Sequence, residues 1–151
     1  MAAIIGFESR MSGETVEWGG YLSYITRWVA YGHIAFEDDS GQIYGFSPDP
    51  LPEVIDIWEK YPACYSNQTR MFSILQGKVK IERFAFDMNW YDEAYMHLRL
   101  RGNESGLYCM RAPIRGPPYN CISYLREVVG VGELPQTNLL AEVFAVLRAR
   151  K

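Results

Sequence analysis

The residue best placed for chemistry in this sequence is Cys121. Residues 117–120 (PPYN) precede it and favour a non-helical approach that ends at a helix N-terminus. Leu125 and Val128 follow at helical spacing, on the same face as the cysteine, and Gly130 fits the end of the helix. The positive end of the helix dipole favours the thiolate form. The pattern therefore predicts a cysteine nucleophile at a helix start.

A thiol nucleophile needs a base or an imidazolium partner, and the chain has two histidines. His33 lies in a β-rich run, and Gly32 and Gly45 leave space around it for a ligand or another backbone. His97 falls on a predicted amphipathic helix without a partner at metal-ligand spacing, so we expect an ordinary, partly exposed histidine there. We therefore predict that His33 assists Cys121.

The remaining site residues are predicted from their positions beside this pair. The backbone N–H of Cys121 would donate to an oxyanion, with Asn120 and Tyr119 as neighbours. Ser47 and Asp49 are the candidates to orient the imidazole, with Ser47 as the third catalytic residue. The alternative is a simple Cys–His dyad assisted by a backbone carbonyl or a water molecule.

A β-hairpin must position the histidine. Residues 33–37 and 42–46 are its predicted strands, joined by a turn over residues 38–41 (DDSG). This turn pairs Glu37 with Gln42 and places Phe46 opposite His33. His33 then lies at the open end of the hairpin, beside Gly45.

Other elements are predicted from apolar periodicity and from turn residues. Residues 15–30 carry aromatic side chains from Trp18 to Trp28 and form either a short helix on the core or one wall of a substrate cleft. The remaining predictions are a strand over residues 3–8, helical turns over Val54–Lys60, a loop over Tyr61–Arg70, a strand over Lys78–Phe84, a helix over Asp87–Arg101 and a last helix capped by Thr137.

Composition narrows the class of protein. A chain of 151 residues with 48% hydrophobic content predicts a single domain over residues 1–151. The net charge of -3 gives no reason to expect a nucleic-acid partner. Three cysteines without a CxxC pair argue against a zinc site, and we expect no metal and no cofactor. Cys64 and Cys109 are expected to be small buried hydrophobes.

The N-terminal residues lack the basic region and the long apolar region of a signal peptide. We therefore expect cytoplasmic synthesis, with secretion only by a system that reads no N-terminal signal. The apolar runs are too short to span a bilayer, so no membrane span is expected.

Three short motifs resemble a known family. Residues 32–36 (GHIAF), 43–48 (IYGFSP) and 119–121 (YNC) are similar to the circularly permuted papain-like proteins, relatives of the NlpC/P60 peptidases. That group includes lecithin:retinol acyltransferase-like enzymes. The same sequence motifs also resemble small bacterial papain-fold toxin or effector domains. The resemblance implies an α+β fold in which an antiparallel sheet carrying His33 packs on the helix carrying Cys121.

The resemblance also implies a function. It points to a cysteine-dependent peptidase or amidase acting on peptidoglycan or on a protein of a target cell, with a cognate immunity or chaperone protein as a further partner. Lipid acyl transfer or thioester hydrolysis, and deamidation of a host protein, are the other enzymatic readings. Acyltransferase-like members carry a second, orienting histidine, and the matching position here is Gly45. The absence of this orienting histidine favours the alternative of a non-catalytic binding module, which would bind a partner through residues 18–28 and 49–52.

Overall fold

The computed structural model describes residues 2–8, 32–49, 56–77, 79–88 and 105–150. These residues form a six-stranded sheet in the order β5-β1-β2-β3-β4-β6, and every neighbouring pair is antiparallel. The strands are β1 (Ala2–Phe7), β2 (His33–Glu37), β3 (Ile43–Pro48), β4 (Tyr61–Asn67), β5 (Glu82–Phe86) and β6 (Ser105–Tyr108). The predicted α+β class with an antiparallel sheet is confirmed.

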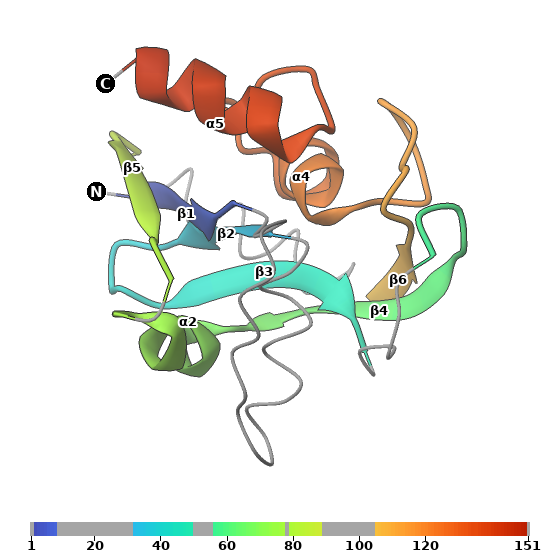
Figure 1. Ribbon diagram of the computed structural model, residues 1–151, viewed down its shortest axis with the longest axis horizontal. Coiled ribbons are helices and arrows are strands. Elements are labelled where there is room, and N and C mark those ends of the chain that lie inside the picture. Colours follow the sequence, from blue (N-terminus) through green and yellow to red (C-terminus); the bar gives the residue numbers. More distant parts are fainter. Residues whose placement is uncertain (1, 9–31, 50–55, 78, 89–104, 151) are drawn as a thin grey trace.

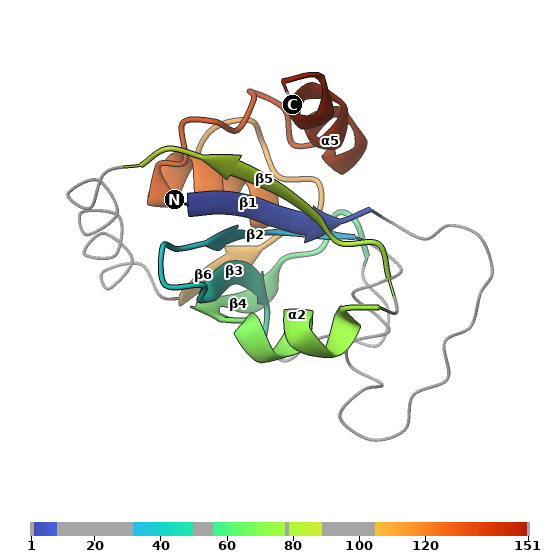
Figure 2. The same cartoon turned by 90° about the vertical axis from the view of Figure 1, so that its left-hand side faces the viewer.

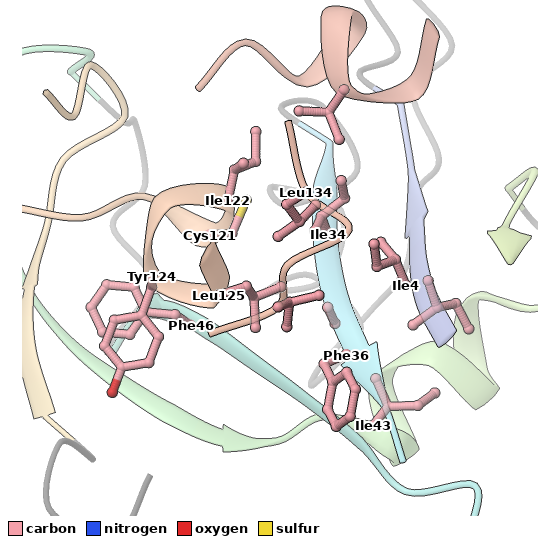
Figure 3. Close-up of a cluster of buried hydrophobic side chains, with 14 of the residues drawn as sticks. Ile4, Ile34, Phe36, Ile43, Phe46, Cys121, Ile122, Tyr124, Leu125 and Leu134 are labelled. Atoms are coloured by element: carbon pink, nitrogen blue, oxygen red, sulfur yellow. The ribbon is translucent and has the colours of Figure 1, made fainter. Parts of the chain in front are cut away.

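Helices cover both faces of the sheet (Figures 1 and 2). One face carries α2 (Thr69–Leu75), and the other carries α4 (Cys121–Ser123), its continuation η1 (Tyr124–Val129) and α5 (Leu140–Ala149). Successive side chains of a strand point to opposite faces. In β2, Ile34 and Phe36 therefore enter the core beneath α4, and this core includes Phe46 and Leu125 (Figure 3).

The strand β1 lies inside the sheet, between β5 and β2. All six of its residues are buried, which explains the unbroken apolar run AAIIGF. Gly6 is required there, because a Cβ atom at this position would lie 2.4 Å from the carbonyl oxygen of His33. The strand that holds the histidine is thus tightly packed on one side.

The predicted hairpin forms, but its register differs by one residue. Glu37 pairs with Ile43 instead of Gln42, and the loop closes through a 2.9 Å hydrogen bond from the backbone N–H of Asp38 to the carbonyl of Gln42. The Asp38 carboxylate accepts hydrogen bonds from the backbone N–H groups of Ser40 and Gln42, which stabilises the longer loop. A slip of one residue exchanges the two faces of a strand. The predicted placement of Phe46 opposite His33 is therefore wrong.

The segment Tyr61–Arg70 was expected to be a loop, and this prediction is wrong. Residues Tyr61–Asn67 form β4, in which Ala63 and Tyr65 are buried while their neighbours are more exposed. The strand β5 also begins later than predicted, at Glu82, because its pairing with β1 aligns Phe84 with Ile4. In both cases pairing with a neighbouring strand, and not local β-propensity, determines which residues form the strand.

Several other predictions concern segments that the structure describes only in part or not at all. The aromatic segment 15–30, His97 and most of the predicted helix over Asp87–Arg101 lie outside the described residues. Within Val54–Lys60, residues 56–60 form a turn, in which the N–H of Glu59 donates to the carbonyl of Asp56 at 3.3 Å, and not a helix. The last helix, α5, starts at Leu140 with Leu139 as its N-cap and without a side-chain cap, so the predicted cap at Thr137 is wrong. The hydroxyl of Thr137 accepts instead from the backbone N–H of Leu139, before the helix.

Candidate active site around Cys121 and His33

A complete capping box starts the helix at Cys121. The side-chain oxygen of Asn120 accepts from the backbone N–H groups of Ile122 and Ser123, at 3.0 and 2.8 Å. The hydroxyl of Ser123 in turn accepts from the backbone N–H of Asn120 at 2.9 Å. Such a box satisfies otherwise unpaired donors at both ends of the first turn. The predicted helix start is therefore confirmed.

The helix widens immediately after the first turn. Residues Tyr124–Val129 form a π-helix, closed by a 2.9 Å hydrogen bond from the N–H of Gly130 to the carbonyl of Leu125. The wider turn rotates the buried face, so that Val129 is fully buried and Val128 only partly. π-Turns in proteins occur frequently at functional sites.

The sulfur of Cys121 lies against the backbone of β2. The thiol is buried, with 6% exposure, and backbone N–H groups of Ile34 and Ile122 donate toward the sulfur. These donors favour the thiolate, but desolvation is the larger effect and raises the pKa of Cys121 to about 11. Figure 3 shows the sulfur beside Ile34 at the start of the helix. At neutral pH the group is therefore a thiol.

His33 is fully buried on the other face of β2. Its ring packs against Phe7 and against Phe72 of α2, with centroid separations of 6.2 and 6.1 Å. Its Nε2 lies 2.6 Å from the side-chain oxygen of Gln68. Burial lowers the pKa of His33 to about 4, and the bond to Gln68 offsets only part of this shift. The imidazole is therefore neutral at physiological pH.

The structure does not bring the two predicted residues into contact, because they lie on opposite faces of β2 and have different hydrogen-bond partners. Cys121 meets the N–H of Ile34, the residue that follows His33, from the side of α4. The imidazole of His33 turns instead to Gln68, on the side of α2. Both groups are uncharged in this arrangement, which is a thiol and a neutral imidazole instead of an ion pair.

The other predicted residues have mainly supporting contacts. The side-chain amide of Asn120 donates to the carbonyls of Met110 and Asn138, so its donors are directed away from Cys121. Tyr119 packs edge-on against Tyr124 at 5.7 Å. These contacts assign structural roles to both, and they leave the backbone N–H of Cys121 as the predicted oxyanion donor.

The two candidate orienting groups differ in their relation to His33. The hydroxyl of Ser47 is buried and lies 3.2 Å from the side-chain nitrogen of Gln68, so it reaches the imidazole only through that amide. Asp49 instead lies 3.4 Å from the sulfur of Cys64, which is partly exposed and not fully buried as expected. Cys109 is buried, as expected.

Sequence reasoning missed Gln68, which is the direct partner of the imidazole. The residue follows β4 directly and precedes the first residue of α2. Its segment was expected to be a loop, so nothing local indicated that the side chain would turn inward. The space at Gly45 was the available signal, because a small residue beside a histidine leaves room for a side chain from elsewhere.

A surface cavity of about 270 Å³ opens at Cys121. Apolar side chains form much of its lining, including Ile57, Met110 and Leu139, and Arg111 is the charged residue among the lining. The buried Cys121 contributes to the lining of this cavity, together with the polar side chains of Tyr108, Asn120 and Asn138.

Comparisons with protein-family models, with curated proteins and with solved structures found no match to this chain. Within the described ranges, no three His, Cys, Asp or Glu side chains gather in a way that could hold a metal ion. The described helices also include none that is both long and apolar enough to cross a membrane.

Proposed function

We propose that the chain is a cysteine-dependent amidase or peptidase in which Cys121 is the nucleophile and His33 the general base. The observation that carries the proposal is the position of Cys121, at a capped helix start and at the edge of an apolar cavity. The thiol meets the backbone N–H of Ile34, the residue that follows His33, while the imidazole faces the other side of β2, so the proposed pairing requires His33 to leave Gln68 and turn toward α4. A permuted papain-like arrangement, with the histidine strand first and the cysteine helix last, is part of the same proposal.

The chemistry follows from these roles. The thiol proton passes to the imidazole as the sulfur attacks the carbonyl carbon of an amide. The backbone N–H of Cys121 donates to the oxyanion, the C–N bond breaks, and the imidazolium returns its proton to the leaving amine. Water, deprotonated by the imidazole, then hydrolyses the thioester and restores the thiol. The transfer of the thiol proton requires the His33 side chain to turn first to the face of α4, because it faces α2 in the free protein.

Peptide amides of bacterial cell walls or of a target protein are the proposed substrates. Wild type and Cys121→Ala should be expressed in the cytoplasm and, with an added signal sequence, in the periplasm of a bacterium. Cysteine-dependent lysis in the periplasm alone supports a cell-wall substrate, whereas toxicity in the cytoplasm supports an internal protein target. Purified wild type should release new amino groups from isolated peptidoglycan in the first case. If Cys121→Ala retains full effect in both compartments, the thiol is not the nucleophile.

A non-catalytic interaction module is the second candidate, and the apolar surface near the cavity favours it. Ile57, Trp58 and Leu139 are exposed by 38%, 69% and 53%, and two of them also line the cavity. A module of this kind would bind its partner equally well with Cys121→Ala. If Cys121→Ala abolishes turnover, the protein is an enzyme; if the wild type shows no turnover and both proteins bind the same partner, it is an interaction module.

A further inference from the structure

We infer that the cavity beside Cys121 binds the C-terminal residue of a peptide, with Arg111 on the terminal carboxylate and the apolar lining around the last side chain. An enzyme and an interaction module can use such a site equally. The binding therefore goes beyond the proposed function and requires neither turnover nor any movement of His33.

Arg111 supplies the positive charge of the cavity. Its side chain is exposed, and its backbone N–H donates to the carbonyl of Ile57 at 3.0 Å, so both residues are held together in the lining. Among the described residues, the ion pairs involve other arginines and lysines, and the cavity lining includes no Asp or Glu. The guanidinium is therefore available to an anion from outside.

Trp58 positions this guanidinium. The Cζ atom of Arg111 lies over the Trp58 ring, 5.3 Å from its centroid, which is within the range of a cation–π contact. The backbone N–H of Trp58 donates to the carboxylate of Asp56 at 2.8 Å, which fixes the turn that carries the ring. A guanidinium that meets a ring through its face keeps its N–H donors for a carboxylate, and such pairs are frequently bidentate.

The two asparagines in the lining bind the protein itself. Asn120 directs its side-chain N–H groups at the carbonyls of Met110 and Asn138. Asn138 directs its own N–H groups at two other backbone carbonyls, and its oxygen accepts from Arg126. These amides are therefore committed to the fold, and recognition of a charged group falls to Arg111.

The apolar part of the cavity limits the size of its ligand. Ile57 and Leu139 are partly exposed there, beside Met110 and Leu140, so an apolar group that covers them is stabilised. The volume of about 270 Å³ lies below the range of roughly 300–1,000 Å³ that drug-sized ligands occupy. It suits one side chain of the size of leucine and not a long acyl chain. One apolar side chain next to one carboxylate is the C-terminal residue of a peptide.

The first test compares two forms of one peptide by isothermal titration calorimetry with the wild type. The probe is an N-acetylated tetrapeptide that ends in leucine, with either a free C-terminal carboxylate or a C-terminal amide. The carboxylate form should bind about 10-fold more tightly or better, because the amide removes the charged partner of the guanidinium. The same peptide ending in glycine should also bind more weakly. Equal binding of the acid and the amide, or no binding of the acid, would overturn the inference.

The second test assigns the binding to its residues. Arg111→Met should reduce the affinity for the acid peptide to that for the amide, and Arg111→Lys should retain part of the difference. Trp58→Ala should also weaken binding of the acid. Arg115→Met is the matched control, because Arg115 is exposed in the same segment but is not part of the described lining, and it should bind as wild type.

Three results would contradict this assignment. An equal loss in Arg115→Met would show a general effect of positive charge. Tighter binding of octanoate than of the peptide would assign the cavity to acyl chains. Self-association of the free protein that Trp58→Ala abolishes would assign the surface to a second copy of the chain.

Discussion

At the scale of single residues, burial decides the charge of the Cys121 thiol and of the His33 imidazole. Cys121 and His33 are both removed from water, and in each case the uncharged form is favoured. A helix N-terminus alone would predict a reactive thiolate, but its effect is smaller than the cost of desolvation here. Folding therefore keeps Cys121 as a buried, uncharged thiol.

Alkylation of Cys121 should reflect this protection. Because burial raises its pKa to about 11, iodoacetamide should modify it slowly at neutral pH, with a rate that rises until the pH nears that value. Peptide mapping by mass spectrometry separates Cys121 from Cys64 and Cys109. Cys64 is partly exposed and serves as the internal comparison. Rapid labelling of Cys121 below pH 8 would contradict the described burial.

Acid should destabilise the fold through His33. The folded protein holds this imidazole with a pKa of about 4, below its usual value of 6.5, so it binds fewer protons than the unfolded chain between these values. The contribution of His33 to the free energy of unfolding is therefore fully present above pH 6.5 and decreases as the pH falls from 6.5 to 4. Below pH 4 it is lost, which amounts to roughly 3 kcal/mol for this group. Urea unfolding at several pH values measures the slope.

The matched variant for this prediction is His33→Phe. It fits the aromatic neighbours of the ring but cannot be protonated, so the slope between pH 6.5 and 4 should be smaller even if the protein is less stable overall. An equal slope in both proteins would assign the acid sensitivity to other groups.

At the scale of elements, local sequence signals predicted which helices and strands exist better than they predicted which elements pair with one another. The hairpin around His33 and the helix at Cys121 were correct because turn residues, capping residues and apolar spacing are local. The register at Glu37 and the strand β4 were not, since they depend on residues far away in the sequence. Gln68 was missed for the same reason: its role arises only when β3, β4 and α2 meet.

The cap at Asn120 should contribute measurably to stability. Asn120→Ala removes the acceptor for two backbone N–H groups and leaves the carbonyls of Met110 and Asn138 without this donor. We expect a loss of about 2 kcal/mol in the free energy of unfolding. Asn120→Asp keeps the acceptor and should lose less. Equal losses in the two variants would show that the cap is not the important contact.

At the scale of the whole molecule, one buried cation ties the cysteine helix to two connecting segments. The guanidinium of Arg126 donates to the carbonyls of Pro135 and Thr137, each at 3.0 Å, and to that of Ile114 at 2.9 Å. It also donates to the side chain of Asn138 at 2.7 Å. The side chain of Arg126 thereby connects the segments before and after the helix. The spacing of charges in the sequence did not predict this connection.

Removing this cation should be more harmful than removing an exposed one. Arg126→Met leaves several buried carbonyl groups without a donor, and we expect it to lower the free energy of unfolding by about 3 kcal/mol or more. Arg115→Met is the matched control, because Arg115 is exposed near the same segment. Thermal unfolding of the two variants provides the comparison. Similar melting temperatures would show that the tie carries little energy.

The central position of β1 has a consequence for how the molecule is assembled. This strand pairs with β5, whose residues follow about 80 positions later in the chain, and the thiol arrives later still. Pairing between such distant segments is slow, because a long loop must close before any contact compensates for it. During synthesis β1 and β2 therefore emerge long before β5 and before the helix that begins at Cys121, so neither the sheet nor the core beneath α4 can be completed until the last third of the chain has left the ribosome. The order of the elements makes the fold a late, post-synthetic event.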